Sequence, residues 1–424
     1  MVYIMDRMQN LSKEETSTIS TLIILVLFSF SLVKYSVFIG GGGVSANYVY
    51  VLIPAVFWVL GIKRRLVKRN QVVIIVTFYT FIYIVGVPGD LFEVTNNPPV
   101  RRLASFTVFL FPLLFSFVEF KPCDIEIFKK SVIIASVYYS FIRISILLER
   151  ISIDSLLDLK VHVGSQRYGF ILCLGFFICL LSDKLIVNKW ILLQRIIFCS
   201  FIFIGELLTF SRSTIVSHLG GFLFIVVLVL FVKKERFRLV YSIVPLVLGA
   251  FVFAAFQIYL DLDILKYYHI TLIEPNLDFT MISSLVGGDA RTSEGFRYHI
   301  FACILEYLAT HPLLGSCYKG IYLVIEEYKT FGSTHNQYTD IFLRTGFLGG
   351  ALWLFLIYRV FRFCRRDRGL QVGLVAILVY GLFHETFKQS QGSFVFAMLL
   401  SFSYMSSSSR QQSEASASAT LSVT

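Results

Sequence analysis

Charged residues are scarce in this chain. Asp, Glu, Lys and Arg make up 15% of its 424 residues, whereas 56% are hydrophobic and 16% are aromatic. The mean hydropathy is +0.74. A chain this apolar lacks the polar side chains that would cover a soluble surface, so the composition excludes a soluble domain and favours a membrane protein.

Cysteines are scarce as well, seven in all, and none has the Cys-x-x-Cys or Cys/His spacing of a metal site. Cys173, Cys179 and Cys199 fall in apolar segments, where packed thiols are the simplest interpretation. Cys303 and Cys317 share one long polar segment, where a disulfide is possible.

Long apolar runs dominate what is present. A spanning helix needs about 20 largely apolar residues, and we predict an all-α polytopic membrane protein with about twelve of them. Because the bilayer core offers no hydrogen-bond partners, helices are expected rather than open strands. The first run is long enough to remain as an anchor, so no cleavable signal peptide is expected. The runs lie at 18–39, 46–62, 71–87, 103–118, 131–148, 168–182, 191–209, 213–232, 239–260, 337–358, 370–384 and 391–405.

The net charge of +11 could suggest a nucleic-acid partner, but its distribution argues against one. With a cytoplasmic N-terminus, the loops lie alternately inside and outside, and the basic residues gather inside. In this positive-inside pattern the basic residues mark the cytoplasmic loops, so the net charge reflects membrane topology. The pattern predicts that both termini are cytoplasmic. The inside loops contain Lys63, Arg64, Arg65, Lys68, Arg69, Lys121, Lys129, Lys130, Lys184, Lys189, Arg195, Lys233, Lys234, Arg236, Arg238, Arg359, Arg362, Arg365, Arg366 and Arg368. The short outside loops contain Arg101, Arg102, Arg150, Arg167, Arg212 and Lys388.

These patterns divide the chain into five segments. A polar lead, 1–17, precedes a membrane region, 18–260, in which the glycines at 40–43 predict a flexible outer turn. One large outside loop follows, and a second membrane region completes the fold. The tail is rich in Ser, Ala and Gln, which predicts disorder. The loop is 261–336, the second membrane region 337–405 and the tail 406–424.

The large loop has a pattern of its own. Apolar residues recur at helical spacing, which predicts an amphipathic helix from about 294 to 309. Pro312 ends that helix and Gly315 permits a turn. A second short helix is predicted from Tyr318 to Tyr328. The apolar positions of the first helix are Phe296, Ile300, Phe301, Ile304 and Leu308.

His335 stands at the outer end of the predicted helix 337–358, where an imidazole near water suits general-base chemistry. The alternative is a polar residue that merely ends a helix. Asn336, Asp340 and Arg344 follow at four-residue spacing and carry a polar stripe into the membrane. Charged groups in a span usually face a cavity or a partner, although Asp340 and Arg344 could pair with each other. We place the stripe on the active-site side.

Arg212 lies at an outer turn, with Glu206 in the preceding apolar run. Either the two form a structural ion pair, or Arg212 binds a phosphate at the membrane surface. A guanidinium suits phosphate because it stays charged and its fork matches two phosphate oxygens. Arg297 opens the amphipathic helix, where a cation opposes the helix dipole and therefore needs a reason. Arg291 could serve as a second clamp.

Several segments are similar to motifs of the O-antigen polymerase and O-antigen ligase superfamily. They are Arg297-Tyr298-His299-Ile300-Phe301, His311-Pro312-Leu313-Leu314-Gly315, Thr334-His335-Asn336-Gln337-Tyr338, Gly346-Phe347-Leu348-Gly349 and Ser211-Arg212. Relatives share an Arg before a His-Pro-Leu-Leu-Gly turn, and here Arg297 stands 14 residues before His311. They also share a His-Asn at the start of a helix with spaced glycines. The resemblance covers about 205–350.

The resemblance implies a C-type glycosyltransferase-like protein of the bacterial inner membrane. Its substrates would be undecaprenyl-pyrophosphate-linked glycans at the periplasmic face, and its acceptor a glycan or lipid A–core. Arg212 and Arg297, with Arg291, would hold the pyrophosphate, and His335 would accept the acceptor's hydroxyl proton. The supporting residues would be Asn336, Asp340, Arg344 and Glu206. A chain-length regulator protein is a candidate partner, and no cofactor is expected.

The chemistry fits these residue types. Pyrophosphate is a good leaving group, so no general acid is needed, unlike glycoside hydrolysis with its two carboxylates. Arginines that stabilise charge and one base opposite them are sufficient. We therefore expect a metal-independent reaction, with inversion at the anomeric carbon if displacement is direct.

The sequence departs from the superfamily in two places. Phe301 stands where many relatives have Trp, and Gly315-Ser316-Cys317 stands where many have Gly-x-Gly. No residue separates a polymerase from a ligase, although the aromatic-rich helices and modest loop favour a polymerase. A flippase or other transporter is the alternative from another class, but paired halves with broken helices are not visible. A scaffold protein would not need Arg212, Arg297 and His335 at one surface.

Overall fold

The computed structural model describes thirteen stretches of the chain, and the account below concerns these residues alone. They are 36–39, 42–45, 70–90, 98–113, 122–149, 169–181, 189–209, 211–231, 236–259, 293–321, 334, 336–388 and 392–404. Three site candidates are affected: Arg291 and His335 lie outside the described residues, and Arg297 is described only as part of a helix backbone.

The described residues are almost entirely helical. The helices are α4 (Asn70–Val85), α5 (Val87–Asp90), α6 (Pro98–Leu113), α7 (Pro122–Glu149), α9 (Gly169–Leu181), α10 (Lys189–Leu207), α11 (Arg212–Phe231), α12 (Arg236–Tyr259), α16 (Ser293–Thr310), α17 (Gln337–Cys364), α18 (Arg368–Tyr380), the 3-10 turn η10 (Thr386–Lys388) and a last helix, Gly392–Tyr404. The apolar runs thus predicted the positions of α4, α9, α10, α11, α12 and the last helix closely. By length and composition, Arg212–Phe231 and Gln337–Cys364 are long and apolar enough to cross a membrane. The number of twelve spans stays a prediction.

Two predictions near the N-terminal side of the chain need correction. Ser36–Ile39, the end of the predicted span 18–39, forms strand β1, which pairs antiparallel with β2, Gly42–Ser45. Two of the four glycines, Gly42 and Gly43, therefore lie in strand β2 rather than in a flexible turn. Most of the span itself lies outside the described residues.

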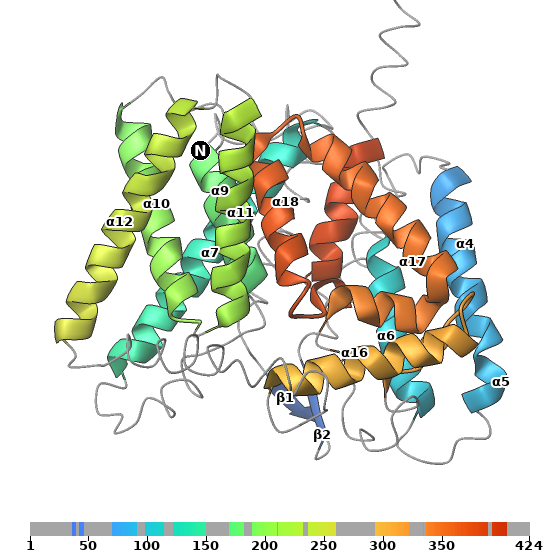
Figure 1. Ribbon diagram of the computed structural model, residues 1–424. Coiled ribbons are helices and arrows are strands. Elements are labelled where there is room, and N and C mark those ends of the chain that lie inside the picture. Colours follow the sequence, from blue (N-terminus) through green and yellow to red (C-terminus); the bar gives the residue numbers. More distant parts are fainter. Residues whose placement is uncertain are drawn as a thin grey trace, which may run out of the picture.

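The helices form two groups around a shared centre (Figure 1). On one side α7, α9, α10, α11 and α12 pack together; on the other lie α4, α6 and α17, and α18 packs against both α9 and α11. The helix predicted at 294–309 is confirmed as α16, and it lies across one end of the molecule, in contact with α17. Ile300, Ile304 and Leu308 of its predicted apolar face are buried, whereas Phe301 is exposed.

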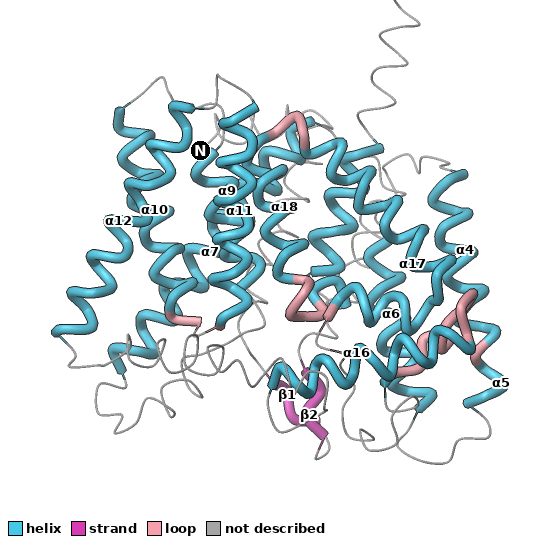
Figure 2. Tube along the Cα trace, viewed as in Figure 1, coloured by secondary structure: helices cyan, strands magenta, loops and turns pink. Residues whose placement is uncertain are grey.

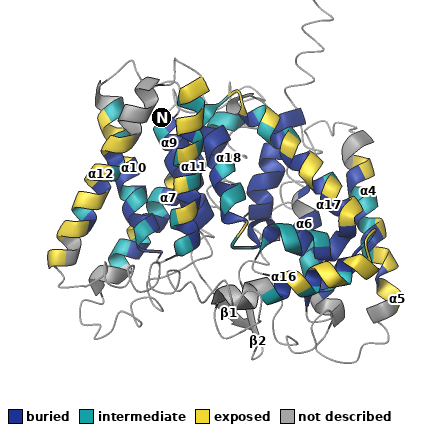
Figure 3. Cartoon of the chain, viewed as in Figure 1, coloured by how far each residue is buried: buried dark blue, intermediate teal, exposed yellow. Residues whose placement is uncertain are grey.

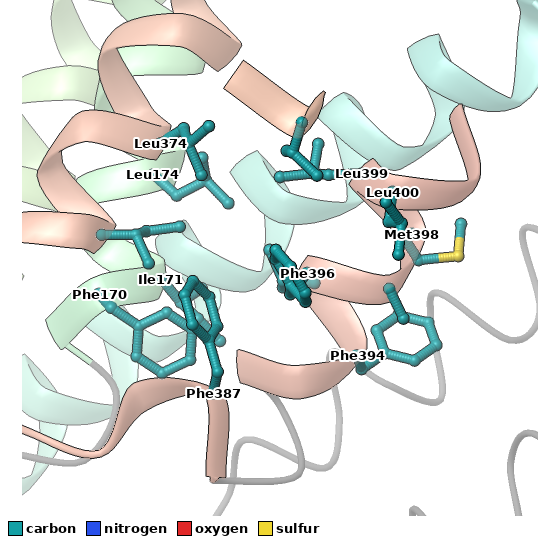
Figure 4. Packing of buried hydrophobic residues seen from close by; sticks show 14 of the residues in the cluster. Phe170, Ile171, Leu174, Leu374, Phe387, Phe394, Phe396, Met398, Leu399 and Leu400 are labelled. Carbon is teal, nitrogen blue, oxygen red and sulfur yellow. The ribbon is translucent and has the colours of Figure 1, made fainter. Parts of the chain in front are cut away.

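The core lies where these groups meet. Leu174 of α9 lies beside Leu374 of α18, and Phe387 packs on Phe396 with ring centroids 4.9 Å apart (Figure 4). The last helix and α9 are buried on nearly every side, whereas α11 and α12 expose apolar faces (Figure 3). Exposed apolar side chains in long stripes suit contact with lipid rather than water. Those on α11 and α12 include Leu219, Leu223, Leu230, Val247 and Phe251.

The turn after α16 locks onto a break in α17. Gly346 has φ 65° and ψ −169°, which interrupts the helix and frees backbone groups on either side. Ser316 N donates to Leu343 O at 2.7 Å, and Phe347 N donates to Pro312 O at 2.8 Å. Freed backbone groups must find partners, and the turn supplies them.

Glycine is required at both contact points of this joint. Gly315 and Gly346 have positive φ, 60° and 65°. A Cβ on Gly315 would meet the backbone at Leu343, and a Cβ on Gly346 would meet the backbone at Leu313. The His-Pro-Leu-Leu-Gly and Gly-Phe-Leu-Gly segments are therefore two halves of one structural joint. The turn reaches Tyr318, whose φ is 70°, so the short helix predicted from Tyr318 does not begin there.

Candidate functional site

Three chain segments that bear polar residues meet at the end of the molecule where α16 lies. α11 begins there, α18 ends there, and α17 begins there (Figure 2). Gln337 joins the last two: its backbone N donates to Gly381 O at 2.7 Å, and its side-chain Oε1 accepts from Phe387 N at 2.5 Å. The start of α17 is therefore fixed against the segment that follows α18.

His384 connects that segment to α11. Its Nε2 lies 2.7 Å from Ser213 Oγ, and Ser213 Oγ lies 2.6 Å from Ser211 Oγ. The His384 ring also stacks on Tyr380, with centroids 4.7 Å apart. These contacts flank Arg212, the first residue of α11, whose side chain is half-buried.

The residues on either side of His335 are held by side-chain contacts. Thr334 donates from its backbone N and from Oγ1 to Glu385 Oε1, the latter at 3.1 Å. Asn336 caps α17, because its Oδ1 accepts from Tyr338 N at 2.9 Å and from Thr339 N at 3.2 Å. A capping side chain satisfies backbone donors that the first helical turn leaves unpaired. Asn336 thus has a structural role at the start of α17.

Helices α11 and α17 both start at this end, and α16 lies across it. Arg212 opens α11, Arg297 lies in the second turn of α16, and Asn336 caps α17. Free N–H groups and the helix dipole make a helix N-terminus favourable for an anion. The arrangement can therefore bind a phosphate-bearing group beside a cluster of hydroxyl, imidazole and carboxylate groups.

Asp340 and Arg344 do pair with each other, as their spacing allows. Arg344 Nε lies 2.9 Å and 2.8 Å from the two Asp340 oxygens, and both residues are buried. Arg344 Nη1 also donates to Tyr318 O at 2.7 Å. The polar stripe therefore faces protein, where it ties α17 to the turn after α16.

Glu206 lies next to an imidazole that the sequence analysis did not consider. Its Oε2 is 2.5 Å from Nδ1 of His218, and the two side chains are 2% and 5% exposed. Although the atoms are close, no hydrogen bond of acceptable angle joins them. The proposed pairing of Glu206 with Arg212 stays a prediction.

Cys303 and Cys317 of the large loop are not joined by the disulfide that their positions allowed. Cys303 Sγ lies 3.8 Å from His299 Nε2, and the carbonyl oxygen of Cys317 accepts from Arg102 Nη1 at 3.1 Å. Burial raises the pKa of the Cys317 thiol, against the opposing charges of Arg102 and Lys319. Cys317 therefore stays protonated at neutral pH and is a poor nucleophile.

Sequence reasoning missed three residues of interest. His384 ends the apolar run 370–384 and Glu385 follows it, so the logic applied to His335, a polar group at an outer helix end, could have found them. His218 lies inside an apolar run and gave no such signal. One further spacing bears on metal dependence: Asp261-Leu262-Asp263 is an Asp-x-Asp outside the described residues, so metal independence stays a prediction.

Residues 197–354 match the family model described as O-antigen ligase, a range that runs from α10 into α17. No curated protein matches the chain. The match confirms the resemblance to the O-antigen polymerase and ligase superfamily, whose members are bacterial membrane proteins. The general activity that it supports is transfer of a glycan from a lipid-linked donor.

Proposed function

We propose that this protein is a surface-polysaccharide polymerase of the O-antigen type. It would transfer an undecaprenyl-pyrophosphate-linked glycan to a hydroxyl of a glycan acceptor at the periplasmic face. The observation that carries the proposal is the meeting of the α11 start, the α17 start and the segment after α18 at one end of the helices. That end gathers Arg212, the neighbours of His335, and His384.

In the proposed reaction an acceptor hydroxyl attacks the anomeric carbon of the donor. The new bond joins the acceptor oxygen to that carbon, and the bond from the carbon to the pyrophosphate oxygen breaks. His335 takes the hydroxyl proton, and undecaprenyl pyrophosphate leaves with the bonding electron pair. Arg212 and Arg297, with Arg291, stabilise the charge that grows on the pyrophosphate. Direct displacement inverts the anomeric centre, and the step needs no metal.

The proposed topology follows from the positions of the basic residues. We place the chain in the bacterial inner membrane with about twelve spans, both termini cytoplasmic and 261–336 periplasmic. The ends of α11, α17 and α18 that meet beside α16 then face the periplasm, where the lipid-linked donor would be presented. The lead 1–17 and the tail 406–424 lie in the cytoplasm, and the membrane regions are 18–260 and 337–405.

A lipopolysaccharide gel from a deletion strain tests the proposal. Complementation with wild type should restore the ladder, and His335→Ala should not, although the protein still inserts. His311→Ala is the matched control, because that imidazole is exposed and stacks on Tyr307 at the end of α16. A normal ladder from His335→Ala would remove His335 from the mechanism.

Replacing Arg212 by Lys tests the phosphate role. Lysine keeps the charge but loses the planar fork, so Arg212→Lys should abolish the ladder. Arg365→Lys, an exposed arginine just after α17, should leave it intact. Full activity of Arg212→Lys would make Arg212 a structural residue.

An O-antigen ligase is the second candidate, because the matching family model carries that description. The gel of the deletion strain separates the two activities. Core with a single repeat means a polymerase, whereas bare core with full-length glycan left on the lipid carrier means a ligase. An unchanged ladder in the deletion strain would mean that the protein works on another surface polymer, or that the proposed activity is wrong.

A further inference from the structure

A second group of reactive side chains lies inside the helix bundle, away from the ends that form the candidate site. Cys173 of α9, Glu206 of α10 and His218 of α11 bring one sulfur, one oxygen and one nitrogen within 4.8 Å of one another. All three are buried, at 0%, 2% and 4% exposure. Together they form what we call the buried triad.

Two members of the buried triad contact each other without an aligned hydrogen bond: Glu206 Oε2 lies 2.5 Å from His218 Nδ1. Neither carboxylate oxygen of Glu206 and neither ring nitrogen of His218 makes a hydrogen bond of acceptable geometry with any described residue. Cys173 Sγ lies 3.6 Å from Thr214 O. Leaving such groups buried and unsatisfied is costly, so the site calls for a partner that satisfies several of them together.

The surroundings restrict what that partner can be. Four phenylalanines enclose the imidazole, with ring centroids 4.4 to 5.3 Å from that of His218. This environment leaves no room for a bulky ligand. The four are Phe176, Phe177, Phe203 and Phe222.

We propose that Cys173, Glu206 and His218 bind a zinc ion that ties α9, α10 and α11 together. Thiolate, carboxylate and imidazole are the three protein ligands that zinc accepts. The ion's two positive charges balance one thiolate and one carboxylate, so the complex is neutral, as a low-dielectric interior favours. Ligand atoms on one tetrahedral zinc lie about 3.3 to 3.6 Å apart, so small side-chain rotations would bring the three donors into place.

The position of the buried triad suggests its role. His218 follows Arg212 by six residues on α11, a distance of about 9 Å along the helix. A metal that fixes α11 against α9 and α10 would therefore hold the start of α11, where Arg212 lies. The zinc is structural, and its presence does not depend on the proposed glycan transfer.

Metal analysis of the full-length protein in detergent tests the proposal. Purified by a metal-free affinity step, wild type should carry about one zinc ion per chain, and Cys173→Ala and Glu206→Gln about tenfold less. Cys199→Ser is the matched control, because it changes another buried cysteine, in α10, and should keep its zinc. Zinc retained equally by the two triad variants would overturn the proposal.

Cobalt spectroscopy keeps the test valid if the variants do not fold. Wild-type protein stripped with a chelator and loaded with Co²⁺ should show a thiolate-to-cobalt charge-transfer band and the intense visible bands of a tetrahedral site. A wild type that takes up neither zinc nor cobalt, or a cobalt spectrum without the thiolate band, would mean that Glu206 and His218 form only an ion pair. Neither measurement depends on glycan transfer, so failure here leaves the proposed function untouched.

Discussion

Asp340 with Arg344 and Glu206 with His218 are two acid–base pairs buried within the helices, yet their surroundings differ. Arg344 Nε approaches both oxygens of Asp340, and its Nη1 donates to Tyr318 O. Glu206 and His218 touch at 2.5 Å without an aligned hydrogen bond. The two pairs are thus buried to nearly the same extent, but only Asp340 and Arg344 are joined by aligned hydrogen bonds.

This difference separates architecture from a binding site. A buried charge is tolerated when its partner and hydrogen bonds satisfy it, as Arg344 is satisfied by Asp340 and by the turn after α16. Buried oxygen and nitrogen atoms without aligned hydrogen bonds are available to coordinate a metal ion. Cys173 adds a third coordinating atom beside Glu206 and His218. Replacing Asp340 or Arg344 is therefore expected to destabilise the protein. Replacing Glu206 or His218 should cost little stability in the absence of metal.

The largest effect is expected from Asp340→Asn. Removing that charge leaves the Arg344 guanidinium buried without its counterion, which should lower the free energy of unfolding by about 3–5 kcal/mol. Denaturant titration in detergent measures the change.

The matched control is Asp367→Asn at the other end of the bundle. Asp367 pairs with Lys129 at 2.7 Å, but Lys129 keeps a second partner, Glu126, at 3.0 Å. An asparagine can still cap α18, so about 1 kcal/mol or less is expected. If Asp340→Asn and Asp367→Asn lose equal free energy of unfolding, the loss of Arg344's buried counterion is not the cause of the larger expected effect.

A smaller loss is expected from Gly346→Ala, which breaks the joint that Arg344 supports. Alanine at this φ and ψ is strained, and its Cβ would meet the backbone at Leu313, so about 2–3 kcal/mol should be lost. Gly220→Ala in α11 is the control, because the nearest atoms to a Cβ there belong to the side chain of Val379 rather than to backbone, and about 1 kcal/mol or less is expected. Similar unfolding midpoints for both variants would argue against the joint.

The sequence could predict what depends on neighbours along the chain. Apolar runs located the helices, Pro312 and Gly315 marked the turn after α16, and four-residue spacing anticipated the pairing of Asp340 with Arg344. The buried triad could not be predicted in this way. Its members lie on three helices, and the rotation of each helix about its axis is set by packing rather than by composition.

The same limit applies to the candidate site. His384 contacts Ser213 across 171 positions, a neighbourhood that no local pattern encodes. By contrast, Asn336 caps α17 through contacts with residues two and three positions ahead in the chain. Its position at the start of the helix could therefore be predicted from the sequence. Motifs along the chain thus indicated the helix ends that carry chemistry, whereas the contacts between those ends required the fold.

The smallest effect is expected from Glu206→Gln in chelator-treated protein. Because neither oxygen of Glu206 has an aligned hydrogen bond, the neutral amide removes a buried charge at little cost, and the free energy of unfolding should change by less than about 1 kcal/mol. Without chelator the same substitution should abolish the stabilisation that added zinc gives wild type, since a ligand stabilises only the state that binds it. Denaturant titrations with and without Zn²⁺ measure both. A loss in chelator-treated protein as large as that of Asp340→Asn would show that Glu206 and His218 are a second structural pair, and the contrast between the two sites would disappear.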